Sequence, residues 1–328
     1  MMNGIQGRGV LGLLAAAVIV AGCGPAGTGT IRVSDVHPES YPTVQGLMRM
    51  AEALEERTNG ELRMQIYHSA QLGRGETDTL QQTRDGDIQI NRISAAPLEP
   101  YSDKIGVLAM PFLFRDAEHK WAVLEGEIGD ELLESIGGGL VGLGWQDSGA
   151  RSFYSTAPLE GPEDLQGLDI RVQDNEIMQA MVRALGATPQ AVPYDELYSA
   201  LQHGVVDAAE NNPPSYYTSG HFNAAPHFIL NEHVQIPEVI VASERWWSRL
   251  SEEDQEAVRE AAQEQLAYQR ERWAEMEEEA FEAVREAGVT IVEPDQAALD
   301  AFADAMAPVF DSHGGAFGDL ISRIEAVE

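Results

Sequence analysis

The sequence predicts an α/β protein made of two compact units joined by one long helix. Strand and helix patterns alternate over residues 30–93, and a second alternation runs over residues 140–207. An amphipathic stretch of more than thirty residues then follows a helix-capping serine, Ser251. Alternating strands and helices are typical of parallel sheets covered by helices. A helix of that length spans more than one unit, because it rises about 1.5 Å per residue.

The first unit contains three expected strands and two expected helices. Pro42 begins the first helix and Asn59-Gly60 ends it, with apolar residues at helical spacing between them. Alternation of apolar and polar residues indicates a half-buried strand after that turn. In order, the expected elements are a strand at 30–34, a helix at 42–58, a strand at 62–67, a helix at 75–84 and a strand at 88–93.

The second unit repeats this alternation after a glycine-rich turn. Its first strand is the apolar run that ends at Trp145, and a later strand carries Arg171 near its end. The expected elements are strands at 140–145 and 168–172, a helix at 176–185, a strand at 190–192, a helix at 194–202 and a strand at 205–207. These elements predict a second parallel sheet with helices on its faces.

The long helix has a defined start and a continuous apolar face. Ser251 is an N-cap with an acidic residue three positions later, and the pattern runs to Gly288. A coiled coil is the alternative, but charged residues occupy too many of its seam positions. The apolar face consists of Val258, Ala262, Leu266, Trp273, Met276, Ala280 and Val284.

The first 22 residues have the pattern of a cleavable leader. Arg8 precedes an apolar run over residues 10–20, which is short for a membrane span and typical of a secretory signal. The string that ends at Cys23, Val-Ala-Gly-Cys, resembles a bacterial lipobox and predicts lipid attachment to this cysteine. A plain secretory peptide is the alternative. Residues 23–29 are then a flexible tether.

The charge balance is strongly acidic. The chain has 54 acidic and 21 basic residues, a formal charge of −33, and it becomes −34 once the leader with its one Arg is removed. Binding to nucleic acid through a basic surface is therefore excluded. The acid excess favours a surface adapted to high salt, where screening shortens the range of self-repulsion.

Motifs of common enzymes are absent from the sequence. There is no P-loop, no Gly-x-Ser-x-Gly elbow and no His pair at metal-ligand spacing. Cys23 is the single cysteine, so neither an intrachain disulfide nor a cysteine zinc site can form. We expect a protein that is not an enzyme and needs neither a cofactor nor a metal.

Two arginines at strand ends are candidates for an anion site. Arg171 ends an apolar strand, where α/β sheets place ligands, and Arg151 follows the strand that ends at Trp145. Asn211 and Asn212 follow the strand expected at 205–207. A guanidinium binds a carboxylate through two parallel hydrogen bonds. The alternative is that each arginine pairs with one of the many acidic residues.

Four strings carry a resemblance to a known family. The chain resembles the DctP-type substrate-binding proteins of TRAP transporters from about residue 30 to residue 291. The order and spacing of the four strings make the resemblance specific. The strings are Ser69-Ala70-Gln71-Leu72-Gly73, residues 108–115, residues 164–172 and residues 204–213.

The resemblance implies a two-lobed fold of the periplasmic-binding-protein type, with the long helix spanning both lobes. Lobe I would contain residues 30–148 plus about 237–270, and lobe II residues 149–236 plus about 271–328. It further implies that Arg171 clamps a substrate carboxylate, with Arg151 and Asn211 at the family's other recurrent polar contacts. One departure from the family is Ala208, where the family usually has glycine. If the backbone is left-handed at this position, alanine would be strained there and the local turn would differ.

Other strings resemble the branch of the family that binds sugar acids. They are residues 36–39, 90–92, 147–151 and 210–214. A polyhydroxy acid needs hydroxyl partners as well as a cation, and we expect these from His37, Glu76, Asn91, Arg92 and Asn211. The alternatives are that His37 caps the first strand, that Glu76 caps a helix, and that Asn91-Arg92 only ties a strand to a loop.

The sequence thus predicts an extracytoplasmic, lipid-anchored protein that captures a sugar acid, a uronate or an aldonate, by lobe closure. It would deliver this ligand to the membrane subunits of a TRAP transporter. One rival is a lipid-anchored hydrolase of acidic sugars, which would place a carboxylate pair in the cleft. A second rival is a receptor whose loaded form docks on a sensor.

Overall fold

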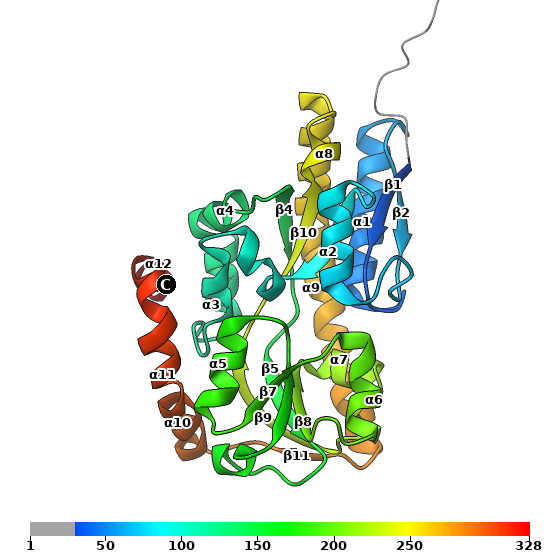
Figure 1. The fold of residues 1–328 in the computed structure, drawn as a ribbon. Helices are drawn as coiled ribbons and strands as arrows, with labels where there is room; N and C mark the ends of the chain where they lie inside the picture. The colour runs from blue at the N-terminus through cyan, green and yellow to red at the C-terminus, as the bar shows by residue number, and fades with distance from the viewer. Residues whose placement is uncertain (1–29) are drawn as a thin grey trace, which may run out of the picture.

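The computed structural model describes residues 30–328 (Figure 1). The leader, the tether and Cys23 lie outside the described residues, so the predictions made for them stay predictions. Among residues 30–328, no helix combines the length and the apolar composition that crossing a membrane requires.

A five-stranded sheet organises the first half of the molecule, in the order β2-β1-β3-β10-β4. Its strands are β1 (Thr30–Ser34), β2 (Arg63–Tyr67), β3 (Ile90–Ser94), β4 (Leu140–Gln146) and β10 (Glu238–Ser243). The first three strands are parallel, because helices α1 (Pro42–Arg57) and α2 (Gly75–Asp85) return the chain between them. The late strand β10 runs antiparallel to both β3 and β4.

A six-stranded sheet organises the other half, in the order β11-β9-β5-β8-β6-β7. Its strands are β5 (Arg151–Ser155), β6 (Asp169–Val172), β7 (Thr188–Ala191), β8 (Ala208–Asn211), β9 (His227–Val234) and β11 (Thr290–Val292). Helices α5 (Glu176–Ala184), α6 (Leu197–Gln202) and α7 (Pro213–Thr218) connect them. Strands β6, β7 and β8 are parallel, and β5 is antiparallel to its neighbours β8 and β9.

The strand expected at 205–207 is wrong by three residues, because β8 begins at Ala208. Gly204 adopts a φ of +67°, and the amides of Val205 and Val206 then bond to the carbonyl of Ala200 at the end of α6. These amides therefore cannot join a sheet. Ala208 itself does not adopt a positive φ, so the alanine found in place of the family's glycine carries no backbone strain there.

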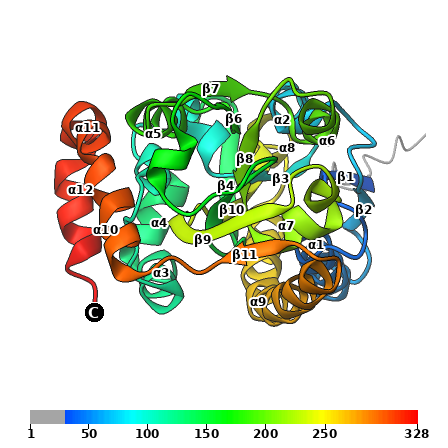
Figure 2. The same ribbon diagram turned by 90° about the horizontal axis from the view of Figure 1, so that it is seen from below.

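Helix α9 (Glu252–Glu286) lies along both halves of the molecule, at the side of α1 and α7 (Figures 1 and 2). Ser251 caps it by accepting a hydrogen bond from the Asp254 amide, as the sequence predicts. Val258 packs into the core beside the first sheet, and Val284 packs into a core beside the second. The prediction of two α/β lobes with a spanning helix is therefore confirmed. The residue boundaries of the lobes remain a prediction.

The remaining helices cover the ends and sides of the sheets. They are α3 (Ala117–Leu124), α4 (Glu127–Glu134), α8 (Glu244–Trp247), α10 (Gln296–Ala305), α11 (Ala307–Val309) and α12 (Gly315–Glu325). The C-terminal helix α12 lies beside α3 and α4, where Nε2 of His119 is 2.9 Å from the carbonyl of Ile324. Helix α10 instead packs on β9 of the second sheet. The C-terminal segment thus contacts both halves.

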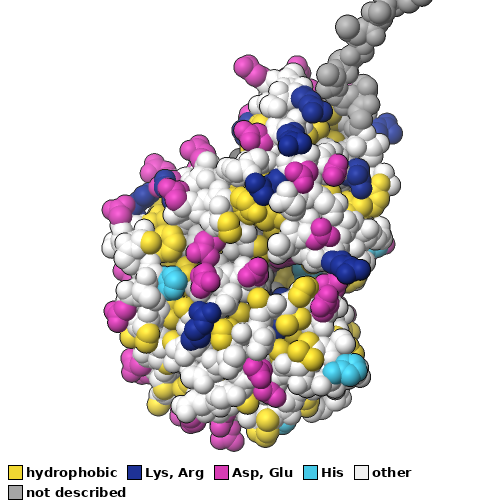
Figure 3. Space-filling view, in the orientation of Figure 1, with side chains coloured by type: hydrophobic (Ala, Val, Ile, Leu, Met, Phe, Trp, Pro, Cys, Tyr) yellow, Lys and Arg dark blue, Asp and Glu magenta, His cyan; other side chains and the backbone are white. Residues whose placement is uncertain are grey.

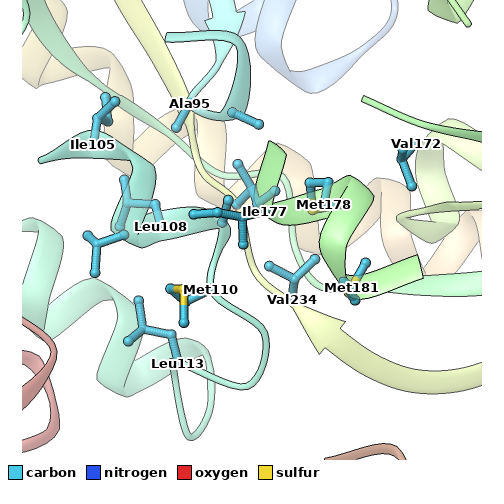
Figure 4. Close-up of a cluster of buried hydrophobic side chains, with 14 of the residues drawn as sticks. Ala95, Ile105, Leu108, Met110, Leu113, Val172, Ile177, Met178, Met181 and Val234 are labelled. Carbon is cyan, nitrogen blue, oxygen red and sulfur yellow. The ribbon is translucent and has the colours of Figure 1, made fainter. Parts of the chain in front are cut away.

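A continuous cluster of buried side chains joins the two halves (Figure 4). Leu108 and Met110 come from the segment before α3, and they pack near Ile177 and Met178 of α5. Val234, at the end of β9, belongs to the same cluster. Buried apolar area stabilises a fold by roughly 25 cal/mol per Å². On this side the two lobes are therefore held together by shared core.

Candidate ligand-binding site

A cavity of about 270 Å³ is lined by residues of both halves. The surface is hollowed between the two halves on the face shown in Figure 3. Six of the seven ligand-binding residues predicted from the sequence line the cavity, whereas Asn91 does not. The six are His37, Glu76, Arg92, Arg151, Arg171 and Asn211.

Arg171 presents a guanidinium without a carboxylate partner. It lies on β6, is 4% exposed, and its Nε donates to the carbonyl of Val192 over 2.8 Å. Across residues 30–328, Arg171 forms no ion pair. Burial lowers its pKa from the usual value, although nearby Glu210 opposes this effect. A buried cation without a counterion is costly, so this site favours an incoming anion.

Arg151 is the opposite case, because a neighbouring strand supplies its counterion. It begins β5, and its guanidinium binds both carboxylate oxygens of Glu210 on β8. Its Nη2 also donates to the Glu210 carbonyl over 3.0 Å. The alternative considered from the sequence, pairing with a protein acid, therefore holds for Arg151. Its charge is largely neutralised, which makes it a hydrogen-bond donor at the cavity wall rather than the main anion site.

Arg92 is held by three carboxylates. Its Nη2 and Nε bind Asp35 at 2.6 and 3.0 Å, and its Nη1 lies 2.7 Å from both Glu76 and Glu238. Arg92 is 1% exposed. Every nitrogen of this guanidinium thus has a protein partner, and the groups offered to the cavity are the carboxylates of Glu76 and Glu238. Glu76 does not cap α2, because its side chain reaches across to β3.

The pKa values in this cluster are set by burial and by the single cation, Arg92, that three acidic side chains share. Burial opposes ionisation of Asp35, but Arg92 and the hydrogen bond to His37 together outweigh burial and hold the pKa of that carboxyl well below its usual range. For Glu238, burial prevails over Arg92 and raises the pKa to about 7. Burial and Arg92 together lower the pKa of His37, so its ring is neutral. This end of the cavity therefore holds hydrogen-bond acceptors and net negative charge.

His37 is fixed in the cavity wall from several sides. Its amide donates to Asp35 over 2.8 Å, and its ring stacks on Tyr41 at 3.9 Å between centroids. A turn with two left-handed residues, Ser69 and Ala70, donates backbone hydrogen bonds to the carbonyls of His37 and Asp35. The motif at 69–73 thus has a structural role, since it positions the segment that carries His37. Strained backbone of this kind concentrates at functional sites.

Asn91 lies outside the cavity lining for a simple geometric reason. Successive residues of a strand point to opposite faces, so Asn91 and Arg92 cannot both face the cavity from β3. The Asn91 amide nitrogen instead donates to Thr79 Oγ1 of α2 over 3.2 Å, on the buried side of the sheet. The alternation rule applied to the sequence would have separated these two neighbours.

Several residues of the cavity wall were not predicted from the sequence. Glu238 and Tyr194 are the most informative, together with Gln173 and Ser215. Glu238 directly precedes the apolar run Val239–Val241, and an acid next to a buried strand is a signal that was available. Tyr194 lies in the stretch predicted to be a helix, and no local pattern marks it as a site residue.

The arrangement defines a class of protein. Two α/β lobes enclose a cavity that holds the buried, unpaired guanidinium of Arg171 together with a set of hydrogen-bond acceptors, and this is a site for a small polar anion. Among residues 30–328, no group of three His, Cys, Asp or Glu side chains is arranged to hold a metal ion. The class is that of a two-lobed solute-binding protein.

Comparison with known proteins identifies the family. Residues 33–314 match the family model described as bacterial extracellular solute-binding protein, family 7. A solute-binding protein of Chromohalobacter salexigens is 34% identical over 296 residues, 90% of this chain and 87% of the relative. The chain therefore belongs to this family, which confirms the resemblance drawn from the four sequence strings.

Solved structures of TRAP periplasmic solute-binding proteins share the fold. One from Bradyrhizobium, in complex with D-galacturonate, has a TM-score of 0.87 at 42% identity and covers 90% of this chain and 99% of its own. Another, from Pseudomonas putida with bound D-glucuronate, has a TM-score of 0.88 at 35% identity and covers 91% and 97%. This chain is a TRAP solute-binding protein.

Proposed function

We propose that this protein captures a hexuronate, a sugar ring that bears one carboxylate, and that Arg171 binds the carboxylate. The observation that carries the proposal concerns the three buried arginines of the cavity wall, Arg92, Arg151 and Arg171: of these, Arg171 has no carboxylate partner. Relatives that bind galacturonate and glucuronate support the choice of ligand. Two parallel hydrogen bonds from the guanidinium would fix the orientation of the acid.

The rest of the cavity favours hydroxyl groups over a second carboxylate. Glu76 and Glu238 present acceptor oxygens, and a sugar hydroxyl can donate to them. The second carboxylate of a dicarboxylate would instead meet these like charges, which repel it. Asn211 and the free face of Arg151 add amide and guanidinium donors for the remaining sugar oxygens.

Capture proceeds by lobe closure around the ligand. The lobes already contact each other directly. Asn175 Nδ2 donates to Glu99 Oε2 over 2.6 Å, and Ser94 Oγ donates over 3.3 Å to Oε1 of Gln173, which lines the cavity. A ligand that binds groups of both lobes stabilises the closed state by its differential affinity for that state.

A hydrolase of acidic sugars is not supported. Glycoside hydrolysis requires two carboxyl groups on either side of the scissile bond. Glu76 and Glu238 both bind the same nitrogen of Arg92, so they lie together on one side of the cavity. The family to which the chain belongs consists of solute-binding proteins.

The proposal places the protein outside the cytoplasm, anchored by lipid on Cys23, where it delivers its ligand to TRAP membrane subunits. The lipobox-like string before Cys23 supports the anchor. Metabolic labelling with a radioactive fatty acid tests it: we expect label in the wild type and none in Cys23→Ser. Equal labelling of both would contradict the anchor.

A thermal-shift and calorimetric panel tests the ligand. We expect D-galacturonate or D-glucuronate to raise the melting temperature, and succinate and neutral galactose to leave it unchanged. Arg171→Ala should weaken uronate binding by about a hundredfold or more, because the bound carboxylate loses its cation. Arg183→Ala, which removes an exposed arginine of α5, is the matched control and should bind like the wild type. Uronate binding that survives Arg171→Ala would refute the proposal.

A further inference from the structure

A buried tyrosine joins the two lobes beside the cavity without lining it. Tyr41 directly precedes α1, and its hydroxyl lies 2.8 Å from Ser215 Oγ and 3.4 Å from Asn212 Oδ1. Ser215 is in α7 and Asn212 caps this helix, so both belong to the half that holds the second sheet. Tyr41 is 1% exposed. This hydrogen bond therefore connects groups that are distant in sequence across a buried interface.

The Tyr41 ring extends the connection in two further directions. It stacks on His37 at 3.9 Å with an interplanar angle of 7°, and His37 in turn lies 5.2 Å from the ring of Tyr194. On another side Tyr41 meets Trp273 of α9 edge-on at 5.9 Å. One side chain thus contacts a residue of each lobe and the helix that spans them. Aromatic pairs in these geometries are favourable beyond the area that they bury.

The neighbours of Tyr41 are cavity residues. His37, Tyr194, Asn212 and Ser215 all line the cavity. We propose that Tyr41 is a positioning residue for ligand capture: its hydroxyl bond to Ser215 stabilises the closed arrangement of the lobes and aligns the cavity walls of both. The proposal rests on the proposed function for its ligand, but the bond itself is independent of which acid is bound.

The physical reason is the cost of separating this bond. If the lobes move apart at this point, the Tyr41 hydroxyl and Ser215 Oγ lose each other, and the buried ring of Tyr41 loses its cover. The bond therefore favours the state that is competent to hold ligand. A ligand's measured dissociation constant rises when the competent state is less populated. Loss of the bond should act mainly on the dissociation rate, as most changes within one interface do.

Tyr41→Phe tests the proposal, because it keeps the ring and removes the hydroxyl. We expect the dissociation constant for D-galacturonate, measured by calorimetry, to rise about three- to tenfold, and stopped-flow dissociation to accelerate by a similar factor. Tyr216→Phe is the matched control. Its hydroxyl donates to the Ala225 carbonyl over 2.7 Å within one half, and the side chain is equally buried. This control should lower the melting temperature and change the dissociation constant less than twofold.

Ser215→Ala and the double variant separate the bond from general destabilisation. Ser215 also lines the cavity, so the informative quantity is the coupling: Ser215→Ala should add less than twofold in the Tyr41→Phe background. Small-angle scattering of the unliganded proteins should show a larger radius of gyration for Tyr41→Phe than for the wild type and Tyr216→Phe. Full additivity of the two substitutions, or equal binding by Tyr41→Phe and Tyr216→Phe, would overturn the proposal.

The two proposals fail in different ways. If the wild type binds no uronate, the proposed function fails, and the scattering comparison still decides the role of Tyr41. If the wild type binds a uronate and Tyr41→Phe behaves like its control in both measurements, only the role of Tyr41 fails.

Discussion

Glu238 carries a third carboxylate into a buried cluster that contains a single guanidinium. Asp35 and Glu76 already bind Arg92, so the cluster holds more negative than positive charge when all three acids are ionised. Burial, together with the neighbouring carboxylates of Glu76 and Asp35, raises the pKa of Glu238 to about 7. Burying this excess of negative charge costs folding free energy. It also leaves carboxylate oxygens in the cavity that can accept hydrogen bonds from ligand hydroxyls.

This raised pKa predicts a pH-dependent effect of Glu238→Gln. Between the usual pKa of 4.5 and about 7, the folded protein holds a proton at Glu238 that the unfolded chain has released. The contribution of this group to stability is therefore present below pH 4.5 and is lost as pH rises through 7. We expect Glu238→Gln to stabilise the unliganded protein by about 2–3 kcal/mol at pH 8, and much less at pH 5.

Calorimetric melting at both pH values checks this expectation. Glu282→Gln, an exposed substitution on α9, is the control and should shift the melting temperature little at either pH. The same stabilisation by Glu238→Gln at pH 5 and pH 8 would contradict a pKa near 7. At the level of single residues, the sequence could offer Arg92 as a candidate for the ligand site but could not reveal its pairing with Glu238, since Glu238 comes from a strand 146 residues away.

Helix α9 was predictable from its apolar face, but the buried polar residue Gln269 on that face was not. The apolar face steps by seven residues from Leu266 to Trp273, and the buried Gln269 fills that gap. Its side-chain amide accepts from the Asp147 amide over 2.7 Å and donates to the Asp147 carbonyl over 2.9 Å. It thereby replaces a neighbouring strand for the segment in which the chain crosses from β4 to β5.

Gln269→Ala should therefore destabilise the fold strongly. The Asp147 amide and carbonyl would both lose their partner in a buried position, and each unsatisfied group costs about 1–3 kcal/mol. We expect the free energy of unfolding in urea to fall by about 2–4 kcal/mol. Gln263→Ala, an exposed glutamine of the same helix, is the control and should cost less than about 0.5 kcal/mol. Equal stability of both variants would rule out this role for Gln269.

Most helices and parallel strands were predictable because each carries its own periodic signal. The strands that enter a sheet antiparallel were not. Strand β5 begins at Arg151 in a polar string and shows no local pattern that distinguishes it from a loop, whereas β10 has a short apolar run, Val239–Val241, that does not reveal its direction in the sheet. Their pairing is decided by distant partners, as the register of Phe153 with Glu210 illustrates. The cavity between the lobes depends on these pairings, and its full lining was therefore beyond the sequence.

At the scale of the whole molecule, the formal charge of −33 is spread over the surface. Figure 3 shows acidic side chains across both halves of the drawn face. Their mutual repulsion opposes the compact state at low ionic strength, and salt shortens its range from about 10 Å at 0.1 M to about 3 Å at 1 M.

We expect the melting temperature to rise by about 5 °C or more between 0.1 and 2 M KCl, as the hypothesis of adaptation to high salt requires. Sucrose at matched osmolality is the control, because it strengthens burial without screening charge. A melting temperature that is flat in KCl, or that rises equally in sucrose, would count against charge screening as the cause.

The shared cluster around Met110 and Ile177 has a consequence for how the protein comes apart. This cluster contains side chains of both halves, so each half on its own would expose a large apolar surface to water. Heating should therefore melt the chain in one cooperative event, and a gene fragment that encodes a single half should yield aggregates instead of a folded piece.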